Sequence, residues 1–154
     1  MKITKISQNG INLIKSFEGF RSKPYLCSAN VPTVGYGSTY YPNGKKVTLN
    51  DQPITEEYAV QLLSTMLDTY EKAVDSYCRD DINQDQFDAL VSFVYNLGNG
   101  SLKSSTLLKK LNVNPNDPTI RDEFMKWVNG GGKKLPGLVR RREAEANLYF
   151  GVSK

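Results

Sequence analysis

Glu18, Cys27 and Thr33 are the residues whose types and spacing can perform chemistry together. Eight residues separate Glu18 from Cys27, and five separate Cys27 from Thr33. A glutamic acid can donate a proton, a cysteine thiolate is a nucleophile or a base, and a threonine hydroxyl can hold a water molecule. Cleavage of a glycosidic bond needs an acid and a second group that delivers a nucleophile to the anomeric carbon. These residue types therefore suit cleavage of a glycan.

Several other kinds of chemistry are excluded by the composition. The 154 residues contain no histidine, so the chain holds no Ser-His-Asp triad, no Cys-His dyad and no histidine-ligated metal site. A cysteine peptidase is therefore a poor alternative, because no histidine can activate Cys27. Cys27 and Cys78 are too few for a four-cysteine zinc site, and we expect two separate thiols. We predict no metal.

The charge and hydropathy patterns are those of a globular protein. The net charge is +4, the hydrophobic fraction is 39% and the charged fraction is 23%. Arg140, Arg141 and Arg142 cannot share one face of a helix, so we do not expect nucleic-acid binding. No apolar run approaches the roughly 20 residues of a membrane span, and the start of the chain lacks the apolar block of a signal peptide.

The elements that position the candidate residues follow from periodicity and turn residues. Apolar residues at helical spacing predict a helix that begins after Ser7 and ends near Gly19, which places Glu18 at its C-terminus. The helix dipole disfavours a negative charge there. From residue 21 to about 51, prolines and glycines punctuate short stretches, and we expect a small, irregular antiparallel sheet. Cys27 and Thr33 fall in this segment.

The rest of the chain reads as helices. We expect a long helix over 55–79, a second helix after an Asn83/Gln86 capping box and ending at Gly98, and further helices at about 104–111, 118–128 and 138–149. Asp117 is the expected N-cap of the helix at 118–128. Residues 130–134 read as a flexible loop.

Together these elements predict an α+β fold in a single domain over residues 1–154. A small β-containing N-terminal lobe occupies about 15–54, a connecting helix 55–80 and a helical lobe 81–154. Two such lobes usually enclose a cleft.

The segment from Glu18 to Gly37 resembles the active-site region of phage-type lysozymes, glycoside hydrolase family 24. That family carries a Glu, eight residues, an Asp or Cys, five residues and a Thr, followed by a Gly-aromatic-Gly turn. Here Gly35-Tyr36-Gly37 supplies the turn. Cys27 replaces the commoner Asp, and Ser38 replaces the His that often follows the turn.

Two later blocks resemble further motifs of the same family, in the same order. Phe93 to Gly98 resembles its Phe-x-Phe-Asn-x-Gly block, and Pro136 to Glu145 resembles its Gly-Leu-x-x-Arg-Arg-x-x-Glu signature, which is chiefly structural. The resemblance therefore covers essentially the whole chain. It implies a lysozyme-like fold with a small β-containing lobe, a long helix and a helical lobe.

The resemblance also implies an activity, that of a phage endolysin causing host cell lysis. Such an enzyme is a muramidase that hydrolyses the β-1,4 bond between N-acetylmuramic acid and N-acetylglucosamine in peptidoglycan, without a cofactor. The implied catalytic residues are Glu18, Cys27 and Thr33, and the candidate substrate-binding residues are Tyr25, Tyr36 and Asn96. Asn96 could equally be an ordinary polar residue near the end of a helix.

The role of Cys27 stays open between two chemistries. Its sulfur either attacks the sugar or positions a water molecule together with Thr33, and the second is favoured because a thiolate bonded to an anomeric carbon leaves poorly. A free glutamic acid has a pKa of about 4.3, so a general acid at neutral pH needs apolar or aromatic neighbours such as Phe17, Phe20 or Tyr25.

Partners and localisation follow from the same resemblance. A monomeric enzyme without a signal peptide would stay in the host cytoplasm until lysis and would then act in the periplasm or cell wall. It would need a separate membrane-permeabilising, holin-like protein for access. The alternatives are a lytic transglycosylase, which transfers the glycan internally, and a non-catalytic module that only binds cell-wall glycan.

Overall fold

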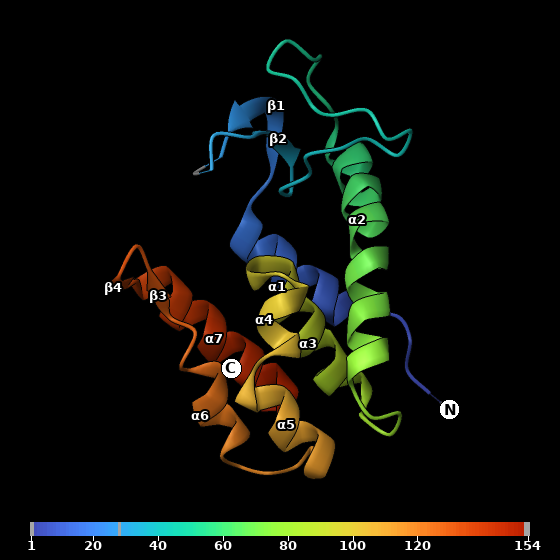
Figure 1. The fold of residues 1–154 in the computed structure, drawn as a ribbon. Coiled ribbons are helices and arrows are strands. Elements are labelled where there is room, and N and C mark those ends of the chain that lie inside the picture. Colours follow the sequence, from blue (N-terminus) through green and yellow to red (C-terminus); the bar gives the residue numbers. More distant parts are fainter. Residues whose placement is uncertain (1, 28, 153–154) are drawn as a thin grey trace. The chain divides into compact units, whose positions relative to one another are not determined.

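The structure is a computed structural model that describes residues 2–27 and 29–152 (Figure 1). The chain forms two compact units: one is Ile14–Thr69, and the other combines Met1–Leu13 with Tyr70–Lys154. The first unit corresponds to the predicted β-containing lobe with the first part of the connecting helix. Among the described residues, no helix has the length and apolar character to cross a membrane.

The unit Ile14–Thr69 contains the predicted irregular sheet. Helix α1 (Gln8–Glu18) enters it, strands β1 (Arg21–Leu26) and β2 (Pro32–Gly35) pair antiparallel, and helix α2 (Glu56–Tyr77) leaves it. The first helix and the long helix are therefore confirmed to within three residues of their expected bounds. The core of this unit is a small apolar cluster, which consists of Val34, Val47 and Leu62 with Tyr41, Ile54 and Tyr58 packed against it.

The other unit is built around a buried helix. Its elements are α3 (Gln84–Leu97), α4 (Asn99–Lys103), α5 (Thr106–Val113), α6 (Ile120–Phe124), β3 (Asn129–Gly130), β4 (Lys133–Lys134) and α7 (Pro136–Tyr149). Helix α3 packs against α7 and α4, and every residue from Gln86 to Val94 is buried. Edge-to-face rings join α3 to α6 and to the segment after it, since Phe93 contacts Phe124 and Trp127.

The predicted start and stop of α3 are confirmed. The Asn83 side chain accepts from the Gln86 N–H at 2.8 Å, and the Gln86 side chain accepts from the Asn83 N–H at 2.9 Å. This reciprocal capping box satisfies two N–H groups that have no partner inside the helix. At the other end Gly98 has φ +92°, a conformation that side chains disfavour, and its N–H donates to the Val94 carbonyl.

Two expectations are wrong in this unit, and one helix was not expected. The short helix α4 was not expected, because only five residues follow the Gly98 stop before the chain turns again. The helix expected at 118–128 is only Ile120–Phe124, and Asp117 does not cap it but binds the N–H and hydroxyl of Thr119 in the preceding turn. The expected loop at 130–134 belongs to a hairpin, in which Gly131 and Gly132 both have positive φ.

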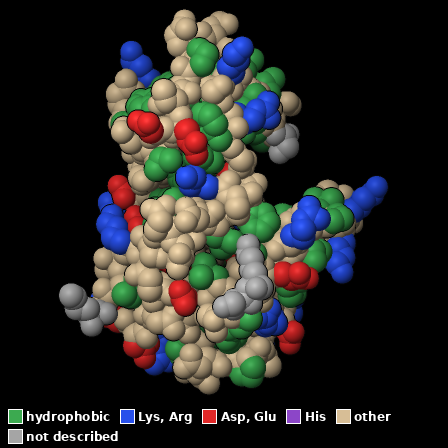
Figure 2. All heavy atoms as spheres, turned by 180° about the vertical axis from the view of Figure 1, so that it is seen from behind, with side chains coloured by type: hydrophobic (Ala, Val, Ile, Leu, Met, Phe, Trp, Pro, Cys, Tyr) green, Lys and Arg blue, Asp and Glu red, His purple; other side chains and the backbone are tan. Residues whose placement is uncertain are grey.

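On the face shown in Figure 2, charge is mixed rather than gathered by sign. Figure 2 shows lysine and arginine side chains interspersed with aspartate and glutamate side chains over one face, in keeping with the net charge of +4. A mixed surface of this kind suits solubility. It gives no support to nucleic-acid binding, which needs basic side chains gathered on one face.

A buried carboxylate fixes the start of α1. Asp88 on α3 is fully buried and accepts from the Ser7 N–H at 2.9 Å, from the Ser7 hydroxyl and from the Gln84 side chain at 2.7 Å. Glu71 on α2 accepts from the Ile6 N–H at 2.7 Å. Gly10 permits this approach, because a Cβ there would lie 2.8 Å from the Asp88 Cβ. Carboxylates of the helical unit therefore cap the helix whose other end carries Glu18.

Replacing Asp88 by Ala is expected to destabilise the protein by about 1 to 3 kcal/mol, because it leaves the partly buried donors of Ser7 and Gln84 without their acceptor. Asp88→Asn should cost less, since its amide oxygen still accepts from one donor. Urea unfolding would measure both changes. Equal free energies of unfolding for Asp88→Ala and the unmodified protein would contradict this account of the cap.

Candidate functional site

Glu18 is the last residue of α1, as the sequence predicted. The helix stops there because Gly19 follows with φ +72°, while its N–H donates to the Lys15 carbonyl at 3.0 Å. The Glu18 side chain is partly exposed. A carboxyl group at this point sits on a rigid element and is still open to a ligand, which is what a proton donor to a bound glycan needs.

Cys27 and Thr33 come together at one end of the β1–β2 hairpin. Cys27 follows β1 directly, and Thr33 on β2 pairs with Tyr25. The connecting loop is closed by hydrogen bonds from the Cys27 N–H to the Val31 carbonyl and from the Asn30 N–H to the Cys27 carbonyl, at 3.1 and 2.8 Å. The structure therefore brings two of the three predicted catalytic residues into contact.

The loop lowers the pKa of the Cys27 thiol below its ordinary value. Hydrogen bonds from the N–H groups of Val31 and Ala29 are the main causes, and the Thr33 hydroxyl adds to them. Because these donors stabilise the thiolate, the thiolate fraction at neutral pH is larger than in a free cysteine. By contrast, burial raises the pKa of the Cys78 thiol to about 12. Both thiols are free, and only Cys27 is exposed enough to react.

Tyr25 links the hairpin residues to Glu18. Partial burial raises the pKa of Tyr25. The Arg21 guanidinium, 4.3 Å from the ring centre, lowers this pKa. The negative charges of Glu18 and Cys27 raise it further. Both acidic groups therefore lie within electrostatic reach of one phenol. Glu18, Tyr25, Cys27 and Thr33 form one cluster in the unit Ile14–Thr69.

Tyr36 occupies a different position from the one expected of a substrate contact. It is 3% exposed, and its hydroxyl donates to Glu56 at 2.5 Å. Burial and this carboxylate raise the pKa of Tyr36 to about 12. The position favours a packing role. Ser38 beside it is also buried, and its hydroxyl has no hydrogen-bond partner among residues 2–27 and 29–152.

Comparison with known proteins identifies the family to which the chain belongs. The family model described as Phage lysozyme matches residues 15–145. The chain belongs to the phage lysozyme family. An endolysin of Bacillus phage B103 is 48% identical over 150 residues, which cover 97% of this chain and 56% of that relative. An endolysin of Acyrthosiphon pisum secondary endosymbiont phage 1 is 40% identical and is covered over 97% of its length.

Solved structures of related proteins agree with this fold. The endolysin from Escherichia coli O157:H7 phage FAHEc1 superposes with a TM-score of 0.87 at 34% identity, and 97% of each chain is covered. The predicted α+β, lysozyme-like fold is therefore confirmed. The chain spans about half the length of the B103 relative, 56%, but nearly the whole of the endosymbiont phage relative, 97%.

Asn96 lies in the other compact unit, near the end of α3. Its side-chain oxygen accepts a short hydrogen bond from the buried guanidinium of Arg142 on α7. Arg142 also lies over the Phe93 ring, 5.3 Å from its centre, and pairs with buried Glu145 at 3.0 Å. The basic run is therefore structural at two of its positions, as expected, because Arg141 and Arg142 are both buried.

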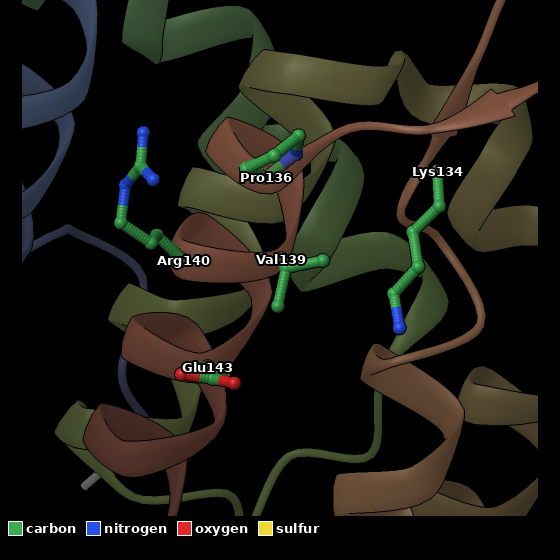
Figure 3. Close-up of a pocket in the computed structure, with 5 residues that line it drawn as sticks. All are labelled: Lys134, Pro136, Val139, Arg140 and Glu143. Atoms are coloured by element: carbon green, nitrogen blue, oxygen red, sulfur yellow. The ribbon is translucent and has the colours of Figure 1, made fainter.

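A surface hollow of about 420 Å³ holds none of the predicted site residues. It is lined by Lys134, Pro136, Val139, Arg140 and Glu143 and lies along α7 (Figure 3). In the described ranges, no three Cys, Asp or Glu side chains gather closely enough to hold a metal ion.

Proposed function

We propose that this phage lysozyme is an endolysin-type muramidase, which hydrolyses the β-1,4 bond between N-acetylmuramic acid and N-acetylglucosamine in peptidoglycan. The observation that carries the proposal is the cluster itself. The Glu18 carboxyl group is partly exposed at the end of α1, and the pKa of the Cys27 thiol is lowered. Both groups interact electrostatically with Tyr25. This is an acid and a second group of the kind that glycoside cleavage requires.

Glu18 is the proposed general acid. Its proton passes to the glycosidic oxygen as the bond to the anomeric carbon breaks, and the sugar develops oxocarbenium character. Water then adds to the anomeric carbon, and its proton leaves to a base. The reaction consumes one water molecule and requires neither a metal nor an organic cofactor.

Cys27 and Thr33 are proposed to hold that water. The Thr33 hydroxyl lies between the Val31 carbonyl, 2.8 Å away, and the Cys27 thiol, and its oxygen lone pairs can accept a hydrogen bond from a water. The Cys27 thiolate, stabilised by the N–H groups of its loop, accepts the second proton of the same water. The alternative, attack of the sulfur on the sugar, would give a covalent intermediate.

Tyr25 and Asn96 are proposed to contact the glycan. Tyr25 lies in the cluster and is partly exposed, and Asn96 is held by Arg142.

The proposed action in the host cell is that of an endolysin. A monomeric enzyme reaches peptidoglycan from the host cytoplasm after a separate holin-like protein has permeabilised the membrane.

A turbidity assay on permeabilised bacteria tests the function. Purified protein should clear the suspension, because each cut of a glycan strand weakens the wall. A protein that adheres to the cells and leaves the turbidity unchanged would be a glycan-binding module, and the proposal would be rejected.

Two substitutions of Cys27 test its role. Cys27→Asp is expected to stay active because a carboxylate also accepts a proton from water, whereas Cys27→Ala should lose most activity. A thiol-blocking reagent should inactivate the unmodified enzyme and spare Cys27→Asp. An α-configured initial product in NMR would indicate water positioning, and a β-configured one attack by sulfur. Full activity of Cys27→Ala would dismiss both roles.

A further inference from the structure

An arginine of strand β1 lies over the ring of Tyr25. The guanidinium carbon of Arg21 is 4.3 Å from the centre of the Tyr25 ring. Both residues belong to β1, in the unit Ile14–Thr69. A guanidinium group is planar, so it stacks on an aromatic face through its flat surface as well as through its charge. One face of the Tyr25 ring is therefore covered by a side chain of its own strand.

An irregularity in β1 makes this contact possible. Arg21 pairs with Gly35 and Tyr25 pairs with Thr33, so β1 advances four positions while β2 advances two. In a regular strand, residues four apart are separated by about 13 Å, because each residue advances about 3.3 Å. The extra residues of β1 bulge out of the ladder, which shortens that distance and brings the two side chains together. Pro24 lies in this bulge, where its missing N–H costs no ladder hydrogen bond.

The bulge is attached to the core of the same unit. The Ile54 N–H donates to the Ser22 carbonyl, which lies inside the bulge, at 2.9 Å. Ile54 in turn packs against the apolar cluster that forms the core of this unit. The backbone that carries Arg21 and Tyr25 is therefore fixed, and the contact between their side chains is a built feature of the hairpin.

The position of Tyr25 suits contact with a sugar ring. Tyr25 is partly exposed, pairs with Thr33 and precedes Cys27 by two positions, so it belongs to the cluster proposed to act on the glycan. A pyranose has an apolar face of C–H groups, and burying that face against an aromatic ring removes apolar surface from water. A side chain that must first become ordered weakens binding, whereas one that is already held does not.

We propose that Arg21 is a positioning residue, which covers one face of the Tyr25 ring and holds the ring so that its other face stacks on the C–H face of a pyranose of the glycan. The inference rests on the proposed function, in which Tyr25 contacts the glycan. Arg21 then affects substrate affinity rather than the chemical step, because it acts only through the Tyr25 ring.

Steady-state kinetics on soluble glycan strands prepared from peptidoglycan test the proposal. Arg21→Gln should raise KM by about two- to fivefold at unchanged kcat, the fold-change that corresponds to one exposed cation–π contact. Lys23→Gln is the matched control, because Lys23 is an exposed cation on the same strand, and its loss should leave both constants nearly unchanged. Equal rises in KM for the two variants would show general attraction of an anionic substrate to positive charge and would overturn the proposal.

A double-mutant cycle with Tyr25 shows whether Arg21 acts through the ring. In the Tyr25→Phe background, which keeps the ring, Arg21→Gln should raise KM by the same factor as in the unmodified protein. In the Tyr25→Leu background, which lacks the ring, it should leave KM nearly unchanged. Equal rises in the Tyr25→Leu and unmodified backgrounds, or a fall in kcat at constant KM, would overturn the proposal. All rates are compared at a temperature at which thermal unfolding shows each variant to be folded.

The outcomes also distinguish this inference from the proposed function. If Glu18→Gln is inactive and Tyr25→Leu raises KM but Arg21→Gln does not, only the role of Arg21 is wrong. If Tyr25→Leu leaves KM unchanged, Tyr25 is not a glycan contact, and the role of Arg21 fails with it while the assignment of Glu18 stands. If Glu18→Gln is active, the proposed function fails, and the inference fails with it.

Discussion

Replacing Glu18 by Gln is expected to lower kcat for peptidoglycan hydrolysis by about 10² to 10⁴, the usual contribution of general acid catalysis. The amide keeps the size of the side chain at the end of α1 but has no proton to give to the glycosidic oxygen. Fold and substrate affinity should be nearly unchanged, because the helix end is fixed by Gly19 and by contacts of Lys15 and Phe20.

The measurement is the initial rate of release of soluble fragments from purified peptidoglycan. Glu57→Gln is the matched control, because it removes an exposed carboxylate in the same unit and should keep the full rate. If Glu18→Gln kept more than about half of the rate, the loss would fall far below the range expected of a general acid, and its assignment would be abandoned.

Glu145→Ala has the largest expected effect on stability, about 3 to 5 kcal/mol out of a total of about 5 to 15. Glu145 is fully buried on α7 and faces two buried guanidinium groups, with Arg141 Nε at 3.3 Å and Arg142 Nη1 at 3.0 Å. It also accepts from the Ser92 hydroxyl on α3 at 2.5 Å. Its removal leaves two buried cations without a carboxylate at the junction of α3 and α7.

Urea unfolding compares this variant with Glu143→Ala, an exposed glutamate two positions earlier on the same helix. The control should change the free energy of unfolding by no more than about 0.5 kcal/mol. Equal effects of the two substitutions would show that the buried network does not stabilise the packing of α7 on α3.

Because Arg142 also holds Asn96, we expect Glu145→Ala to weaken glycan binding under conditions in which the variant still folds.

Local signals predicted the elements that carry the site. The helix stop at Gly19 and the capping box at Asn83 and Gln86 depend on residues within one turn of each other, so the sequence shows them directly. The motif spacing predicted Cys27 and Thr33 as partners, and the hairpin register explains the spacing, since it brings Thr33 back to the loop that begins with Cys27.

Interactions between distant segments could not be predicted from the sequence. The capping of α1 by Asp88 joins residues 81 positions apart. Glu56 contacts both Lys15 and Tyr36, although the sequence predicted Tyr36 as a substrate contact. The sequence pattern of a tyrosine beside a glycine turn is the same whether the tyrosine ring is buried or exposed to solvent. Only the packing of the hairpin on α2 decides, and packing depends on the whole core.

Mass spectrometry of peptidoglycan fragments tests the central claim most directly. Purified sacculi digested by the unmodified protein should yield fragments that end in reducing N-acetylmuramic acid and carry one added water for each cut, and Glu18→Gln should yield essentially none. Anhydro ends would contradict hydrolysis and indicate a lytic transglycosylase. Ends in reducing N-acetylglucosamine would contradict the bond assigned here, and an absence of fragments with the unmodified protein would contradict catalysis itself.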